Sequence, residues 1–199
     1  MKLLKNTIIL LLVLFATVTM EAQRLKLTEG SLAPLKEEKN INVEFTYDNL
    51  AVGKYSNEQD YISKKKEEYN KKEPGRGDSW EKTWKSDRKY EFEPKFTDLF
   101  QEYSEMVISK KPAKYTLIFH TTYTEPGYNI YISRKYAEID AEVSIVETDN
   151  RSHVIAVISI QKAPGRTFGG NDYATGDRIR ECYADAGKYL GKFIVKNRK

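Results

Sequence analysis

The amino-acid sequence predicts an α+β domain in which a mixed or antiparallel sheet of about four to five strands is covered by two to three helices. Two observations predict this class. Three stretches in the second half of the chain have the alternating or β-rich character of strands, and amphipathic helical patterns precede and follow them. Each of these helices has one apolar face, so the helices are available to cover the sheet.

The first 22 residues have the layout of a secretory signal peptide. Lys2 and Lys5 are positively charged, residues 8–18 are apolar apart from one threonine, and Ala22 is a small residue suited to cleavage. Folded as a helix, the apolar stretch is about 16 Å long, well short of the roughly 30 Å hydrocarbon core of a bilayer. We therefore predict that residues 1–22 are removed and that the mature chain is periplasmic or secreted.

Composition narrows the function classes. The chain has 33 basic and 29 acidic residues, a net charge of +4, and its lysines alternate with glutamates, as in residues 64–68. Such a run is typical of a solvated helix face, so we expect no nucleic-acid partner. No further apolar stretch is long enough for a membrane span, and no cysteine near the cleavage site offers a lipid acceptor. Cys182 is the only cysteine, so packing and not disulfides must stabilise the fold.

The first half of the mature chain has two clear elements. Residues 23–40 mix charge, glycine and proline without a sustained period, so we treat them as a lead-in segment and residues 41–199 as a single α+β domain. Alternating apolar and polar side chains predict a strand over 41–47. Helical spacing then predicts a helix over 58–72 with a thin apolar stripe, ended by the proline and glycines that follow.

The middle of the chain is the least regular part. Residues 75–79 contain the integrin-recognition tripeptide Arg-Gly-Asp in an expected exposed loop, which leaves an adhesive role as an alternative. Residues 80–90 are polar and aromatic with no clean period, so we expect a long, partly ordered connection with at most one short helix. From Pro94 to Ser109, apolar side chains recur at three- and four-residue spacing and predict a second helix.

Three strands and a helix complete the predicted domain. Residues 115–124 are rich in threonine and aromatic residues, residues 137–145 alternate strictly, and residues 154–160 are almost wholly apolar. A five-residue connection predicts that the last two form a hairpin, and the apolar run predicts a central strand covered on both faces. The closing helix is expected to begin between Asp172 and Thr175, with the only cysteine in its apolar stripe.

The order of these elements is strand, helix, helix, strand, strand, strand, helix, over residues 41–196. It resembles the amino-terminal domain of TolB and the CsgG-like periplasmic proteins. The residues that carry the resemblance are Glu-Pro-Gly at 125–127, the hairpin of 142–160 and Ala-Gly-Lys at 186–188. The resemblance implies a noncatalytic binding or assembly module of the bacterial cell envelope, with an unidentified envelope protein as partner. The lipid-bearing cysteine of many CsgG-like proteins is absent.

A glycine-rich loop before the closing helix is the candidate binding site. Gly169 and Gly170 lie next to the expected helix start, where backbone N–H groups can bind an anion. Arg166 adds positive charge, and Asp172 closes the loop. The spacing matches neither a P-loop nor a dinucleotide fingerprint. A ligand-contacting loop and a plain strand-to-helix connection both fit these residues.

The sequence contains no recognisable catalytic motif. It has no Gly-x-Ser-x-Gly elbow, and His120 and His153 stand without further ligands at metal-binding spacing. Glu138, Asp140 and Glu142 alternate with apolar residues, which is typical of the wet face of a strand. We therefore expect no metal and no cofactor, and favour an exported noncatalytic interaction or assembly domain over an enzyme. A carboxylate-dependent envelope hydrolase and a small-ligand carrier remain the alternatives.

Overall fold

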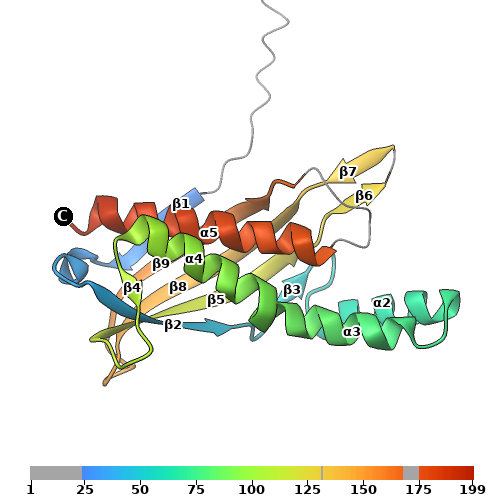
Figure 1. The fold of residues 1–199 in the computed structure, drawn as a ribbon, viewed down its shortest axis with the longest axis horizontal. Coiled ribbons are helices and arrows are strands. Elements are labelled where there is room, and N and C mark those ends of the chain that lie inside the picture. Colours follow the sequence, from blue (N-terminus) through green and yellow to red (C-terminus); the bar gives the residue numbers. More distant parts are fainter. Residues whose placement is uncertain (1–23, 131, 168–174) are drawn as a thin grey trace, which may run out of the picture.

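The computed structural model describes residues 24–130, 132–167 and 175–199. The strands are β1 (Arg24–Gly30), β2 (Asn40–Thr46), β3 (Ala51–Val52), β4 (Val107–Ile108), β5 (Tyr115–Glu125), β6 (Tyr128–Ile130), β7 (Ser133–Lys135), β8 (Ala137–Glu147) and β9 (Val154–Gly165). The helices are α2 (Glu58–Lys72), α3 (Arg76–Asp87), α4 (Glu93–Ser104) and α5 (Thr175–Asn197), with a 3-10 turn η1 (Ala33–Leu35) and a π-helical turn η2 (Arg88–Phe92). α4 and α5 run side by side across one face of the sheet (Figure 1).

The sheet confirms the predicted α+β class. Its strand order is β1-β9-β8-β5-β2-β4, with β3 beside β5. β5 is parallel to β2 and β3 and antiparallel to β8, and β8 and β9 form the predicted hairpin. The sheet has seven strands, more than predicted, because β1 and the two-residue strands β3 and β4 extend it.

Aromatic side chains between the sheet and the helices form the centre of the core. Phe96 of α4 contacts Phe45 of β2 and Phe119 of β5, with ring centroids 5.3 and 4.7 Å apart. Tyr183 of α5 is buried beside Phe119, and its hydroxyl oxygen lies 2.7 Å from Thr121 Oγ1. The buried hydroxyl therefore keeps a hydrogen-bond partner. Cys182 on the same helix is fully buried as predicted, and burial raises the pKa of its thiol well above the usual value.

α4 and α5 approach so closely that backbone meets backbone. A Cβ atom added at Gly187 of α5 would lie 2.4 Å from the carbonyl oxygen of Phe96. One added at Gly191 would lie 2.8 Å from the amide nitrogen of Ser104. Since these distances leave no room for a side chain, the two glycines set the spacing of the helices over the sheet.

The lead-in segment contains an unexpected strand. β1 pairs antiparallel with β9 and places Leu25 and Leu27 against the core. A register shift between Leu27 and Glu29 interrupts the alternation, so the sequence shows no sustained period there. The predicted signal peptide, residues 1–22, lies outside the described residues.

The region predicted as a long connection is helical. α3 and η2 occupy most of it and continue directly into α4. The sequence pattern is weak because α3 packs mainly along α2, through Trp80 and Trp84, and most of its other side chains are partly or fully exposed. The Arg-Gly-Asp tripeptide forms the first turn of α3, not an exposed loop. Gly77 is buried there, and its amide donates a 2.7 Å hydrogen bond to Asn70 Oδ1.

The helix predicted to reach Ser109 ends earlier. α4 stops at Ser104, and Glu105 adopts a left-handed conformation with a φ of 58°. The buried Ser104 hydroxyl accepts a hydrogen bond from the Met106 amide, and Val107 then pairs with β2. Met106 and Val107 continue the helical spacing of apolar residues in the sequence. In the structure Met106 lies in the turn after α4, and Val107 begins the strand β4.

The prediction that β9 is covered on both faces is wrong. β9 is an inner strand between β1 and β8, and Ala156, Ile158 and Ile160 are fully buried on its helix side. On the other side Val157 is only partly buried, and Val154 at the strand start is exposed. The apolar run reflects an inner position in the sheet and not a second covering layer.

Asp87, at the end of α3, is expected to make the folding stability of the protein depend on pH. Burial, with smaller contributions from Glu91 and Asp177, raises its pKa from the usual 3.8 to about 6. The folded protein therefore holds this proton more tightly than the unfolded chain does. The stabilising contribution is complete below about pH 4 and is lost as the pH rises through about 6.

We expect Asp87→Asn to raise the melting temperature at pH 7 and to raise it progressively less as the pH falls toward 4. Thermal unfolding of both proteins across this range measures the effect. The exposed Asp98→Asn substitution on α4 is the control and should show no such trend. A constant difference between Asp87→Asn and the parent protein at every pH would contradict the account.

Candidate functional site: a tyrosine-lined pocket

A cavity of about 350 Å³ opens where β3 and β5 end. These strand ends lie toward the right-hand side of Figure 1. We call it the tyrosine pocket. Its lining comes from the turn after β3, one side of α2, the turn between β5 and β6, and the start of α5. The lining residues are Val52, Gly53, Lys54, Tyr55, Tyr61, Lys65, Tyr69, Glu125, Pro126, Gly127, Tyr128 and Thr175.

The predicted thin stripe of α2 forms one wall of the tyrosine pocket. Tyr61 and Tyr69 are about two turns apart and so project from the same side of the helix. Their ring centroids lie 5.8 and 5.7 Å from that of Trp80 on α3. The ring centroid of Tyr61 also lies 5.9 Å from that of Tyr55. Aromatic rings from α3 thus support the wall from behind, which keeps the tyrosine rings in place.

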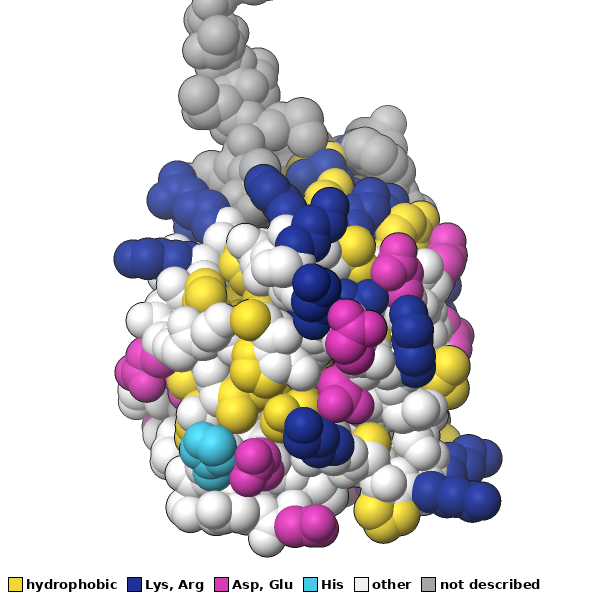
Figure 2. All heavy atoms as spheres, turned by 90° about the vertical axis from the view of Figure 1, so that its left-hand side faces the viewer, with side chains coloured by type: hydrophobic (Ala, Val, Ile, Leu, Met, Phe, Trp, Pro, Cys, Tyr) yellow, Lys and Arg dark blue, Asp and Glu magenta, His cyan; other side chains and the backbone are white. Residues whose placement is uncertain are grey.

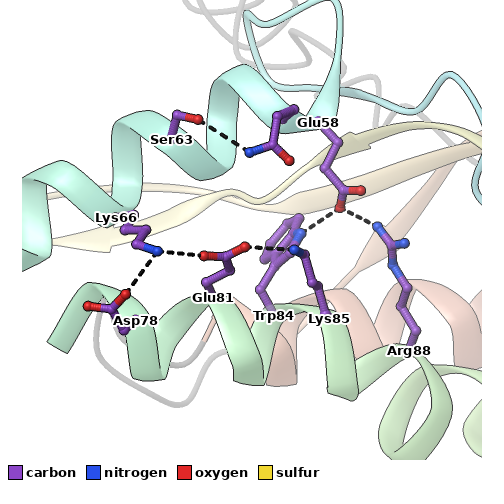
Figure 3. A network of polar contacts seen from close by, with 9 residues as sticks. Glu58, Ser63, Lys66, Asp78, Glu81, Trp84, Lys85 and Arg88 are labelled. Carbon is purple, nitrogen blue, oxygen red and sulfur yellow. Dashed lines mark hydrogen bonds and ion pairs between the residues drawn. The ribbon is translucent and has the colours of Figure 1, made fainter. Parts of the chain in front are cut away.

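Polar contacts between α2 and α3 hold this wall together (Figure 3). Glu58 of α2 accepts hydrogen bonds from Trp84 Nε1, at 2.6 Å, and from Arg88. Further along the same two helices, Lys66 Nζ of α2 lies 3.1 Å from Glu81 Oε2 of α3. Charge-assisted hydrogen bonds of this kind restrain orientation as well as distance. The α2–α3 pair therefore acts as a fixed frame for the pocket.

The turn between β5 and β6 forms another wall, and it is tightly fixed. Glu125 accepts a 3.0 Å hydrogen bond from the Gly127 amide and lies 2.6 Å from Lys135 Nζ. Gly127 has a φ of 62°, and a Cβ atom there would lie 2.5 Å from the carbonyl oxygen of Lys135. The buried Arg178 of α5 donates a 3.2 Å hydrogen bond to the Pro126 carbonyl. The carboxylate of Glu125 is therefore engaged in shaping this turn.

Positive side chains line the edge of the tyrosine pocket. Lys54 Nζ lies 5.5 Å from the ring centroid of Tyr55, and Lys65 Nζ lies 5.7 Å from that of Tyr69. Two further cations lie 5.7 Å from the Tyr69 ring, namely Lys72 and Arg76. With the carboxylate in the lining already paired, the pocket combines aromatic surfaces with positive charge. Such a combination favours a ligand that is partly apolar and negatively charged.

Of the predicted loop site, only Arg166 can be placed, since Gly169, Gly170 and Asp172 lie outside the described residues. Arg166 is exposed and lines a groove of about 240 Å³ between the end of β9, α4 and α5. Asp185 lines the same groove. Burial raises the pKa of this carboxyl group, and the Arg166 guanidinium opposes the rise. Arg166 thus interacts with a carboxylate of its own chain, and ligand binding by this loop stays a prediction.

The predicted carboxylates and histidines do not gather at the tyrosine pocket. Glu138, Asp140 and Glu142 alternate with buried residues along β8, as the sequence pattern predicts. His120 lies on β5 with Nδ1 2.8 Å from a threonine hydroxyl group, and His153 pairs with a glutamate. Among the described residues, no group of three or more histidine, cysteine, aspartate or glutamate side chains is arranged to hold a metal. None of the described helices combines the length and apolar character needed to cross a membrane.

Sequence reasoning missed the tyrosine pocket because its lining comes from separate segments of the chain. One signal was available. The chain has 14 tyrosines, and Tyr61 and Tyr69 supply most of the apolar surface of an otherwise charged helix. Tyrosine on such a helix is unusual enough to suggest a polar contact as well as an apolar one.

Comparison with known proteins leaves the family open. No family model matches the sequence, and no curated protein matches it. Two structures of the PelC dodecamer from Paraburkholderia phytofirmans each give a TM-score of 0.36 at 12% identity, covering 82% of this chain and 96% or 97% of theirs. A DUF330 protein from Xanthomonas campestris gives 0.35 at 8% identity, covering 84% of this chain and 91% of its own. TM-scores this low carry no functional conclusion, so the residues of this chain must supply it.

Proposed function

We propose that this chain is a noncatalytic binding domain of the bacterial cell envelope, and that the tyrosine pocket holds one ring of an acidic saccharide. One observation carries the proposal: four tyrosines and two lysines surround a cavity of about 350 Å³. A cavity of this size suits a small ring system. The predicted export signal and the resemblance of the element order to TolB and CsgG-like domains favour an envelope location and a binding role.

The aromatic lining favours a sugar over a purely apolar ligand. A pyranose ring has a face of C–H groups, which packs well on the negative face of a tyrosine ring. Its hydroxyl groups need hydrogen-bond partners once they leave water. Tyr55 and Tyr128 offer hydroxyl groups beside their rings, and Lys54 and Lys65 offer further donors at the edge.

The two lysines favour an acidic sugar over a neutral one. Lys54 and Lys65 both line the tyrosine pocket, whereas Glu125, the one carboxylate among the described lining residues, is paired with Lys135. Lys65 Nζ also lies 3.7 Å from Glu68 Oε2, and Glu68 is not among the lining residues. A carboxylate on the ligand would therefore meet Lys54 and the positive member of a surface ion pair, and no unpaired like charge among the described lining residues. The pairing of Glu125 with Lys135 also argues against the hydrolase alternative. Glycoside hydrolysis ordinarily uses two carboxylates across the scissile bond, and the described lining holds one.

Fluorescence titration tests the proposal, because Trp80 lies behind Tyr61 and Tyr69. We expect galacturonic acid trimer to change the tryptophan emission saturably. The neutral galactose trimer should bind at least about fivefold more weakly, as expected for the loss of about 1 kcal/mol of charge interaction. Replacing both Lys54 and Lys65 with glutamine should remove the difference between the two sugars. Equal binding of both sugars by the parent protein, or no response to either, would contradict the proposal.

A further inference from the structure

The β6–β7 hairpin projects from the molecule (Figure 1). Its first residue, Tyr128, lines the tyrosine pocket, and the hairpin carries exposed apolar side chains. Ile132 at its tip is 89% exposed, the highest value among the exposed large hydrophobic residues, and Ile130 is 48% exposed. Tyr128 and Tyr136 flank the hairpin at its root and are also exposed. The most solvent-accessible apolar surface of the described chain therefore lies at the end of a projecting hairpin.

Neither the turn nor the packing explains these residues. β6 and β7 pair from Tyr128 with Lys135 to Ile130 with Ser133, so two residues connect them. Two-residue hairpin turns strongly prefer asparagine, aspartate or glycine, and the chain between Ile130 and Ser133 has none of these. Ile132 thus occupies a turn position where backbone geometry favours a small or polar residue. A contact outside the chain is the physical reason that remains for these residues.

The charges on the hairpin identify the kind of surface that it suits. Arg134 lies two residues after Ile132, Lys135 lies at the root, and residues 128–136 contain no acidic side chain. Apolar side chains at a tip, tyrosines behind them and neighbouring basic residues are the arrangement of interfacial membrane anchors. Arg134 complements the negative charge of anionic lipid headgroups.

The hairpin has a root that can transmit such an attachment to the domain. At this root, the backbone of Lys135 and Ala137 approaches Gly127 too closely to leave room for a side chain at residue 127. Lys135 is also paired with Glu125. Arg178 of α5 donates hydrogen bonds to the carbonyl groups of Pro126 and Gly127. The hairpin is therefore fixed to the central sheet and to the longest helix.

The opposite end of the molecule differs. There, hydrophobic side chains at the surface are interspersed with charged side chains of both signs (Figure 2). Val154, at the start of β9 after the β8–β9 turn, is 45% exposed, close to the value for Ile130. It provides a matched exposed aliphatic residue on a different hairpin.

We propose that the β6–β7 hairpin attaches the protein peripherally to an anionic lipid bilayer. Ile130 and Ile132 enter the boundary between headgroups and acyl chains, and Arg134 lies among the headgroups. Attachment does not depend on the proposed saccharide binding. It places the opening of the tyrosine pocket, whose lining includes Tyr128, close to the membrane surface.

Vesicle flotation of the chain lacking the predicted signal peptide tests this proposal. We expect the protein to float with phosphatidylcholine vesicles that contain phosphatidylglycerol, and less with phosphatidylcholine alone. Ile130→Ser combined with Ile132→Ser should weaken partitioning by at least about tenfold, because two aliphatic side chains no longer leave water. Arg134→Gln should weaken it about fivefold on anionic vesicles only. Val154→Ser should have no effect.

Circular dichroism and thermal unfolding of the double serine variant establish that it is folded. Retained flotation of that folded variant would overturn the proposal, as would equal loss with Val154→Ser. Failure of the parent protein to float with anionic vesicles would also overturn it and would favour a protein partner for the hairpin. Saccharide titration of the double variant should match the parent protein, which separates this proposal from the function proposed for the tyrosine pocket.

Discussion

Replacing Gly187 with leucine is expected to remove most of the folding stability of the protein. The Cβ atom alone would lie 2.4 Å from the carbonyl oxygen of Phe96 and 3.2 Å from the amide nitrogen of Phe100. Backbone atoms cannot rotate away as a flexible side chain can. α4 must therefore move off α5, and with it Phe96, which lies fully buried at the centre of the core. Natural domains have only about 5–15 kcal/mol of stability to lose.

Gly187→Ala is the finer test, because two effects oppose each other. Alanine favours a helix by about 1 kcal/mol over glycine, whereas overpacking costs about 1–3 kcal/mol. At a distance of 2.4 Å to a backbone oxygen we expect overpacking to dominate, so the alanine variant should be less stable. Urea unfolding followed by tryptophan fluorescence measures both variants. Lys192→Leu, at an exposed position one turn further along α5, should change the free energy of unfolding little. A more stable Gly187→Ala protein would contradict the packing described for α4 and α5.

Tyr128→Ala is expected to reduce binding of galacturonic acid trimer by roughly 30-fold, the effect of losing about 2 kcal/mol at an aromatic binding residue. Tyr128 lines the tyrosine pocket and is 38% exposed, so its removal should leave the core intact. Tyr128→Phe keeps the ring and loses only the hydroxyl group. It should retain most of the affinity if packing on the sugar face provides the larger part.

Tyr189→Ala is the matched control for this prediction. Tyr189 is 39% exposed on α5 and has Lys188 and Lys192 within cation–π distance, yet it is not among the residues that line the tyrosine pocket. It therefore reproduces the exposure and the charged surroundings of a pocket tyrosine elsewhere on the surface. Equal losses of affinity for Tyr128→Ala and Tyr189→Ala would indicate nonspecific binding of the sugar to cationic aromatic surface.

Elements with strong periodic patterns were predicted well. The helix expected over 58–72 is α2, with the same bounds, and the hairpin of β8 and β9 is present. β8 and β9 pack one face against α5, so their pattern of burial is visible in the sequence. α2 is predictable from the helical spacing of its thin apolar stripe and from the proline and glycines that follow it. α3 packs mainly against α2 through two tryptophans, and β3 and β4 are two residues long. Elements of this kind depend on tertiary contacts that no local pattern records.

The site was less predictable than the fold. The glycine-rich loop is a candidate site because glycine and arginine next to a helix start suggest anion binding, which is a local signal. The tyrosine pocket has a local signal only in the tyrosines of α2, because Tyr55, Tyr61 and Tyr128 come from three segments that only the fold brings together. In the sequence, the turn at Glu125 is one of the features that carry the resemblance to TolB and CsgG-like domains. In the structure it forms part of the pocket lining.

The most direct test of the tyrosine pocket is the location of a bound acidic sugar, measured by amide chemical-shift changes during titration with galacturonic acid trimer. We predict that the largest saturable changes fall on the amides of Gly53, Tyr55 and Gly127, which line the pocket. Changes centred on Arg166 and Asp185 would place the sugar in the groove beside α4 and α5 and would contradict the account.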